Sequence, residues 1–370
     1  MIRRLSVWTL AVLAAGVATS VVRAQDASPG AAAPVTLTVA GRSSSTPWIA
    51  AHGSRVAVAW AAADHGQSDI FVAMSSDAGA TFAAPVQVNT VVGEARVNGE
   101  IPPRVALHVK PGAPTPDVVV AWNAKDQGTE IKIARSVDGG RTFAAPVSLQ
   151  ATGAAGDRGW HSLALDQDGV AHVIWLDHRG LAEPKDTQAA MMGGEHDGVA
   201  MAQKSRLYYA SFGVRASPER ALTPGVCYCC KSAVVALPGG RLVAAWRHVY
   251  ADNMRDMAFT VSRDGGRTFA APAPVSQDGW SINGCPDDGP ALAAGPDRAV
   301  HIVWPTVIPG AEPMGALFYS VLRDEPSFAP RTRIPTLGAP KPSYPQIVVD
   351  GAGRMVAAWD ESVDGVRTAA

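Results

Sequence analysis

The chain has 370 residues, of which 47% are hydrophobic and 18% charged, a balance that excludes an intrinsically disordered protein. Its net charge of -1 provides no positive field for nucleic acid or an anionic membrane, so neither partner is expected. Length alone suggests two or three domains, but the repeats described below predict one.

The N-terminus has the pattern of a signal peptide. Residues 1–4 contain two arginines, residues 6–22 carry no charge, and small residues occupy the -3 and -1 positions of a cut after Ala24. The alternative is an uncleaved anchor, at the short limit for a membrane span. We expect a periplasmic or secreted protein with no membrane segment after cleavage. The predicted organisation is a signal peptide (1–24), a linker (25–34) and a single domain (35–370).

Six short apolar runs that end in tryptophan repeat along the rest of the chain, at intervals of 53 to 71 residues. This period suits one four-stranded blade of a β-propeller for each repeat. The sequence therefore predicts an all-β fold, a six-bladed β-propeller of four-stranded antiparallel blades. The chain ends soon after the sixth run, so residues 35–39 are expected to supply the last outer strand unless the chain is incomplete. The runs end at Trp60, Trp122, Trp175, Trp246, Trp304 and Trp359.

A second repeat, Ser-x-Asp-x-Gly-x-Thr-Phe, occurs at Ser75–Phe82, Ser136–Phe143 and Ser262–Phe269. In such a turn Asp accepts backbone N–H bonds, Gly adopts a positive φ and the aromatic residue packs between strands. The motif resembles the Asp-box of the bacterial neuraminidase (BNR) repeat, and the whole domain resembles the sialidase-like six-bladed propellers. This resemblance implies that the turns are structural and lie on the face opposite the functional site.

The same resemblance implies a test for sialidase chemistry. The family clamps a sugar carboxylate with three arginines and uses a tyrosine nucleophile paired with a glutamate, plus an aspartate acid/base. Tyr344 corresponds to the family tyrosine, but Ser45 stands where the first arginine belongs, and Arg104 and Arg247 match no family motif. The arginine triad is not recognisable, so we assign no catalytic residue, and exo-α-sialidase activity is kept as an alternative.

All four cysteines lie just before the first strands of two consecutive blades. Disulfides are the first explanation in an exported protein, but Cys285 can bridge only one of the other three. The remaining two would pair within a four-residue segment, which strains the bond. A soft-metal site explains the cluster better, provided that the chain turns there, because an extended segment points alternate side chains to opposite sides. The predicted ligands are Cys227, Cys229, Cys230 and Cys285.

Loops near this rim add soft donors, although each also has an ordinary structural explanation. Thiolates together with thioethers favour Cu(I), and zinc is less favoured. The Cys-x-x-Cys-Lys segment is a weaker match to a haem-attachment site, because Lys replaces the usual His. The additional ligand candidates are His161, His248, Met191, Met192 and Met254.

The leading functional hypothesis is an exported propeller that binds copper on its rim. One alternative is a sialidase-like glycan hydrolase or glycan-binding protein that uses the same mouth, with Tyr344. Another is a protein-interaction scaffold whose cysteines are only structural. The expected partners are accordingly a metal ion and, in the alternatives, a glycan or a periplasmic protein.

Overall fold

The computed structural model describes residues 34–370 except 126–127, 152–155, 182–197, 285, 325 and 339–340. The predicted signal peptide and nearly all of the predicted linker therefore lie outside the described residues. No helix among the described residues has the length and apolarity needed to cross a bilayer.

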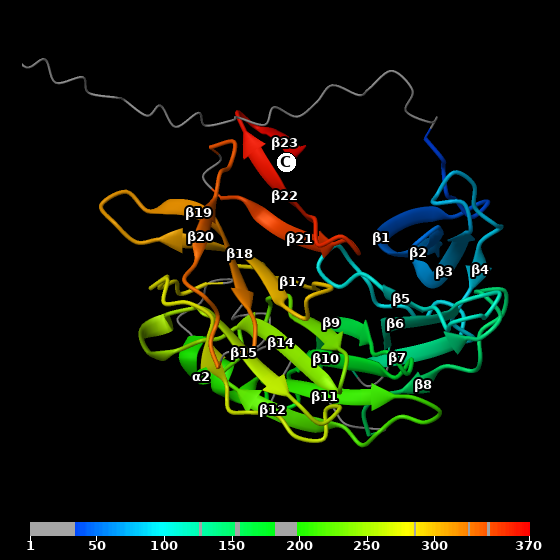
Figure 1. Cartoon of the computed structure of the whole chain (residues 1–370), viewed down its shortest axis with the longest axis horizontal. Coiled ribbons are helices and arrows are strands. Elements are labelled where there is room, and N and C mark those ends of the chain that lie inside the picture. Colours follow the sequence, from blue (N-terminus) through cyan, green and yellow to red (C-terminus); the bar gives the residue numbers. More distant parts are fainter. Residues whose placement is uncertain are drawn as a thin grey trace, which may run out of the picture. The chain divides into compact units, whose positions relative to one another are not determined.

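Six antiparallel sheets follow one another in chain order, as the colours of Figure 1 show, and form the predicted six-bladed propeller. The first strands of successive blades contact one another from blade one to blade six. The blades are β1 (Ser43–His52), β2 (Arg55–Asp64), β3 (Gln67–Ser75) and β4 (Val86–Gln87); β5 (Arg104–His108), β6 (Asp117–Lys125), β7 (Thr129–Ser136) and β8 (Val147–Ser148); β9 (Arg158–Leu165), β10 (Ala171–Asp177), β11 (Arg206–Phe212) and β12 (Arg220–Pro224); β13 (Ala233–Leu237), β14 (Arg241–Arg247), β15 (Met257–Ser262) and β16 (Ala273–Pro274); β17 (Ala291–Ala294), β18 (Val300–Ile308), β19 (Met314–Leu322) and β20 (Thr332–Ile334); and β21 (Ser343–Val349), β22 (Met355–Val363) and β23 (Val366–Ala369). Blade three also carries helix α2 (Gly198–Lys204), and a 3-10 turn η1 (Ala251–Asn253) follows β14.

Each tryptophan run forms the second strand of its blade, as predicted. The second strands of the middle blades are buried along most of their length, and Trp122, Trp175, Trp246 and Trp304 have almost no exposed surface. Strands buried on both faces read as continuous apolar runs, which is why these segments are recognisable in the sequence.

The three Ser-x-Asp-x-Gly-x-Thr-Phe segments connect the third strand to the fourth strand in blades one, two and four. All three contain the same side-chain hydrogen bonds, from Ser to Asp and from Thr to Asp. In the first, Asp77 accepts hydrogen bonds from the Thr81 backbone N–H at 2.9 Å and its hydroxyl at 2.6 Å. Ser75 donates to Asp77 at 2.7 Å and accepts from the Gly79 N–H at 2.9 Å. These hydrogen bonds lower the pKa of Asp77 to about 2, and the bond from the Thr81 hydroxyl has the largest effect. The Asp77 carboxylate in the turn is therefore ionised at neutral pH.

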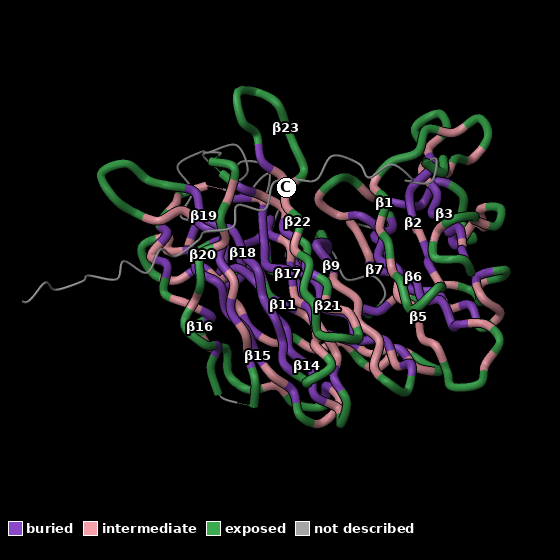
Figure 2. The backbone as a smooth tube through the Cα atoms, turned by 45° about the horizontal axis from the view of Figure 1, so that its top comes forward, coloured by how far each residue is buried: buried purple, intermediate pink, exposed green. Residues whose placement is uncertain are grey.

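The sixth sheet has three strands among the described residues. Residues 35–39 do not supply a fourth, because they form no strand and Leu37 and Val39 instead pack against the core around Trp60 in blade one. The hairpin of β22 and β23 is mostly exposed, in contrast to the buried middle blades (Figure 2).

Candidate functional site

The first strands of blades one, three and six share a bulge where they reach the centre of the propeller. In β1, β9 and β21 the pairing register shifts by an extra residue at this point. Thr46, Trp160 and Tyr344 stand in these bulges with φ of 52°, 50° and 56°. A positive φ is costly for a residue with a side chain, and such bulges commonly re-aim side chains next to functional sites.

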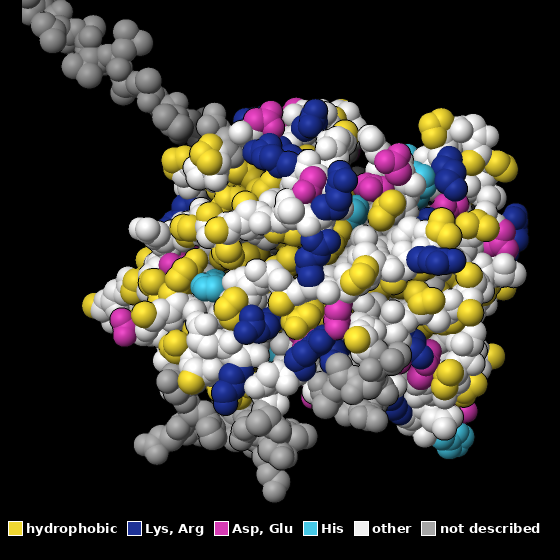
Figure 3. Space-filling view, turned by 90° about the horizontal axis from the view of Figure 1, so that it is seen from below, with side chains coloured by type: hydrophobic (Ala, Val, Ile, Leu, Met, Phe, Trp, Pro, Cys, Tyr) yellow, Lys and Arg dark blue, Asp and Glu magenta, His cyan; other side chains and the backbone are white. Residues whose placement is uncertain are grey.

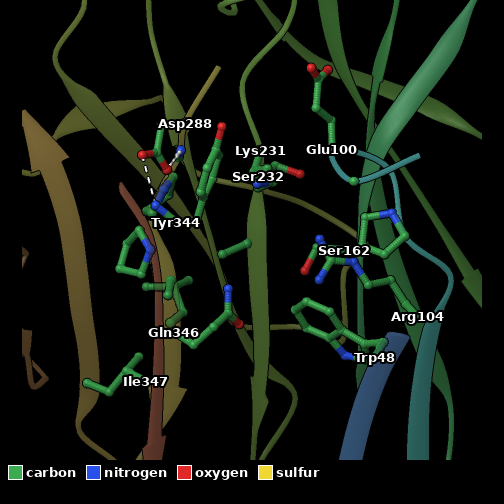
Figure 4. A pocket seen from close by; sticks show the side chains of 18 of the residues that line it. Trp48, Glu100, Arg104, Ser162, Lys231, Ser232, Asp288, Tyr344, Gln346 and Ile347 are labelled. Atoms are coloured by element: carbon green, nitrogen blue, oxygen red, sulfur yellow. Dashed lines mark hydrogen bonds between the residues drawn. The ribbon is translucent and has the colours of Figure 1, made fainter. Parts of the chain in front are cut away.

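The bulges at Thr46 and Tyr344 border a cavity of about 1030 Å³ that residues from all six blades line. Figure 4 shows Trp48, Arg104, Glu100, Lys231 and Tyr344 projecting toward this common space from different strands and loops. The structure thus gathers at one mouth the segments that lead into the first strands, as the repeat pattern predicted. Among the lining residues are Trp48, Glu100, Arg104, Ser162, Lys231, Asp287, Asp288, Tyr344, Asp360 and Arg367.

Tyr344 is held by two consecutive aspartates of blade five. Its hydroxyl donates to Asp287 Oδ2 at 3.1 Å, and its backbone N–H donates to Asp288 Oδ2 at 3.0 Å. The ammonium nitrogen of Lys231 lies 3.7 Å from the centre of the Tyr344 ring, a cation–π contact. The tyrosine side chain is therefore fixed in position and direction at the edge of the cavity.

The ionisable groups of the mouth have perturbed pKa values. Burial, and then the neighbouring Asp287, raise the pKa of Glu100, while Lys231 opposes this shift. Burial also raises the pKa of Asp288 to about 6, although the hydrogen bond from the Tyr344 N–H and the charges of Arg247 and Lys231 act to lower it. The pKa of Tyr344 rises to about 12 through burial and Asp287, and burial lowers the pKa of Lys231. Such clusters in a cavity are typical of sites that move protons.

Two buried oxygens that belong to cavity-lining residues have no hydrogen-bond partner. They are Thr46 Oγ1 and Asp287 Oδ1. Buried polar atoms are normally paired, so these two oxygens are exceptions at the edge of the cavity.

The cations of the mouth do not form an arginine clamp. The guanidinium of Arg104 lies 3.6 Å from the Trp48 ring and its Nε donates to the His161 carbonyl at 3.1 Å. Arg367 is paired with Asp360. Arg247 is fully buried behind the mouth, where its guanidinium donates to three backbone carbonyls. On the face shown in Figure 3, basic and acidic side chains are interspersed.

The cysteine cluster lies next to this mouth but inside the protein. The chain turns, with the Cys230 N–H donating to the Cys227 carbonyl at 3.3 Å. This turn brings the sulfurs of Cys227, Cys229 and Cys230 within 4.8 Å of one another, all buried. Cys229 is disulfide-bonded, whereas Cys227 and Cys230 are free, with their sulfurs 2.7 Å apart. The fourth predicted ligand, Cys285, lies outside the described residues.

Two buried arginines make the free thiols unequal. Burial raises the pKa of Cys227, but the hydrogen bond with Cys230 and the charges of Arg255 and Arg247 outweigh it and bring the pKa to about 6. Burial and the Cys227 sulfur raise the pKa of Cys230 well above its ordinary value. Cys227 is therefore the member of the pair that loses its proton more readily.

The histidine and methionine candidates do not join the cysteines. His161 has both ring nitrogens in contact with other groups, Asn123 Oδ1 at 3.0 Å and the Ala121 carbonyl at 3.2 Å. His248 accepts from the Trp246 indole at 3.3 Å and packs on Tyr250. Neither histidine lies in the described three-cysteine group. Met254 is half-buried and pairs with Ser281 through the backbone. Met191 and Met192 lie outside the described residues.

Glu100 is the main cavity residue that the sequence reasoning missed. It stands in the long connection before β5, four residues ahead of Arg104, and no repeat or spacing distinguishes it from other surface acids. Its meeting with Asp287, from a blade far along the chain, is visible only in three dimensions.

Comparisons with known proteins support the fold. No protein-family model matches the chain, and no curated protein matches its sequence. A solved protein of unknown function from Dyadobacter fermentans has a TM-score of 0.52 at 15% identity, covering 90% of this chain and 95% of its own. The intramolecular trans-sialidase from Ruminococcus gnavus, solved with oseltamivir carboxylate, has a TM-score of 0.51 at 10% identity, with coverage of 86% and 90%. The six-bladed propeller fold expected from the repeats is thereby confirmed.

Proposed function

We propose that this protein is a glycoside hydrolase that binds a neutral saccharide in the mouth of the propeller. The observation that carries the proposal is the Tyr344–Asp287 hydrogen bond beside Glu100, in a cavity lined by all six blades. A cavity with convergent polar groups and perturbed acids is the default location of an active site.

The chemistry follows from the positions of these groups. Asp287 is placed to take the proton of the Tyr344 hydroxyl as that oxygen attacks the anomeric carbon, since the two are already hydrogen-bonded. Glu100, whose pKa burial and Asp287 raise, is the candidate acid that protonates the leaving oxygen. Water then attacks the anomeric carbon and gives its proton to Glu100, and Asp287 returns its proton to the Tyr344 oxygen as the bond between that oxygen and the sugar breaks.

A neutral substrate fits the charges better than an acidic one. Arg104 already contacts Trp48 and a backbone carbonyl, Arg367 pairs with Asp360, and Lys231 faces carboxylates and the Tyr344 ring. These engaged cations differ from the three arginines that clamp a carboxylate in bidentate geometry. The trans-sialidase relative supports a sugar ligand only through the shared fold.

Hydrolysis of 4-nitrophenyl glycosides tests the proposal. A panel of neutral pyranosides and furanosides, with the corresponding α-sialoside, would be assayed with the full chain. We expect turnover of a neutral glycoside, and Tyr344→Phe should lower kcat by about 100-fold or more while KM changes little. Tyr319→Phe is the matched control, because it removes a tyrosine hydroxyl that bonds His301 in blade five, outside the lining of the cavity.

Two results would contradict this assignment. Undiminished turnover by Tyr344→Phe would remove the tyrosine from the chemistry. Turnover of the sialoside alone would replace the neutral substrate class with an acidic one.

A second candidate function, favoured by the three clustered sulfurs, is binding of Cu(I) by the exported protein. Two free thiols fall short of the four ligands that zinc takes, and soft thiolates favour Cu(I). The sulfurs of Cys227 and Cys230 would have to separate, because ligands about 2.3 Å from one tetrahedral ion lie roughly 3.8 Å apart. Cys229 would contribute only if its disulfide were reduced.

Anaerobic titration of the exported, chelator-treated protein with Cu(I), followed by metal analysis, tests this function. We expect about one copper per chain, and its loss in Cys227→Ser/Cys230→Ser. Met314→Leu, which removes an exposed thioether from β19, should bind as the wild type does. Equal copper content in the double variant would place the metal elsewhere and end this candidate.

A further inference from the structure

The free cysteine pair has a geometry that neither proposal above uses. The Cys227 and Cys230 sulfurs are 2.7 Å apart, and both residues are only 1% exposed. Sulfurs in a disulfide are about 2.05 Å apart. The turn closed by the Cys230 N–H holds the two side chains on the same side of the backbone. Little movement therefore separates this dithiol from a bonded pair.

Arg255 distinguishes one sulfur from the other. This arginine is fully buried, and its Nη1 donates to Cys227 Sγ at 3.2 Å, while its Nε donates to the Ile282 carbonyl at 3.0 Å. Among the described residues no ion pair joins Arg255 to a carboxylate, and its contact with Cys227 places a buried cationic donor on this sulfur. A cationic hydrogen-bond donor stabilises a thiolate, which is the nucleophilic form of cysteine.

We propose that Cys227 and Cys230 form a peroxide-reactive dithiol, in which Cys227 is oxidised first and Cys230 then closes a disulfide with it. The Cys227 thiolate attacks one oxygen of hydrogen peroxide and the O–O bond breaks. Cys227 becomes a sulfenic acid, and the released hydroxide takes a proton to become water. The Cys230 sulfur then attacks Cys227 Sγ, the S–O bond breaks and a second water leaves. The peroxide gains the two electrons that the two thiols lose.

Burial selects the class of oxidant. For Cys227 to exchange with the disulfide of another protein, a sulfur of that disulfide would have to approach Cys227 Sγ along the axis of the breaking S–S bond. Cys227 lies in a core cluster with Tyr228, Trp246 and Met201, and this burial prevents the approach. A peroxide is close to water in size and needs no such opening. The site is thus suited to a small oxidant.

Peroxide treatment of the full chain tests the inference, with Cys227 and Cys230 as free thiols, the Cys229 disulfide intact and a chelator present so that no metal occupies the sulfurs. We expect the intact mass to fall by about 2 Da, with Cys227 and Cys230 joined on peptide mapping. In Cys230→Ser, a dimedone adduct should form on Cys227. In Cys227→Ser, Cys230 should react at least about tenfold more slowly, because no guanidinium hydrogen bond faces it.

Arg255→Met should slow the oxidation of Cys227 about tenfold, and Arg255→Lys should restore part of the rate because it keeps the charge. Near-ultraviolet circular dichroism would confirm that each variant keeps its fold. Equal peroxide rates in the two serine variants, or oxidation of methionines while both thiols survive, would overturn the proposal. Failure of copper binding or of glycoside hydrolysis leaves this result unaffected, since neither metal nor sugar is present.

Discussion

At the scale of single residues, buried polar groups without partners occur in several blades of the described chain. His178 is an example, since it is 2% exposed, packs against Trp160 and has no hydrogen-bond partner on either ring nitrogen. Burial lowers its pKa to about 4, so the folded protein keeps it neutral. Groups of this kind make stability depend on pH.

Acid should therefore weaken the fold through His178. His178 takes up a proton near pH 6.5 in the unfolded chain but only near pH 4 in the folded protein. The free energy of unfolding therefore increases with pH between these two values and decreases as the pH falls. The slope is about 1.4 kcal/mol per pH unit for one such histidine. When the pH falls from 6.5 to 4.5, the free energy of unfolding measured with urea should decrease by about 2 kcal/mol more in the wild type than in His178→Gln. Equal losses would show that another group carries the dependence.

At the scale of elements, two kinds of backbone device shape the molecule. Turns with glycine at positive φ close the outer hairpins, and bulges with non-glycine residues at positive φ bring Thr46, Trp160 and Tyr344 to the mouth. The turns carry a clear sequence motif. The bulges carry none, because the strain that they store is compensated by tertiary contacts such as the Tyr344–Asp288 bond.

The turn at Ser262–Phe269 offers a test with an internal control. Gly265 and Gly266 have φ of 71° and 81°, and a Cβ at Gly265 would meet nothing within 4 Å. A Cβ at Gly266 would overlap the hydroxyl of Tyr209 in the neighbouring blade. We expect Gly265→Ala to cost about 1 kcal/mol and Gly266→Ala about 2–4 kcal/mol in urea unfolding. Similar costs would mean that Tyr209 moves away freely and that the blades pack loosely there.

At the scale of the whole molecule, the propeller gathers at one cavity the residues that the chain keeps far apart. Glu100, Lys231, Asp287 and Tyr344 come from four blades, and their ionisation is coupled only because the first strands converge on the centre. The cysteine pair is part of the same arrangement, since Lys231 of the mouth follows Cys230 directly in the chain. The proposed active site and the proposed dithiol are therefore neighbours in the chain.

The sequence by itself determined the six blades, the second-strand tryptophans, the turn motif and the segments that border the mouth. These features depend on alternation, period and turn chemistry, which are local properties of a chain. The grouping of three cysteines was also predictable, provided that the chain turns there, because they lie within four consecutive residues. Only the tertiary structure decided that Cys227 and Cys230 are the free pair, that Arg255 bonds one of them, and that Glu100 meets Asp287. Those facts depend on side-chain directions set by a turn, by bulges and by contacts between blades, and no local pattern in the chain encodes them.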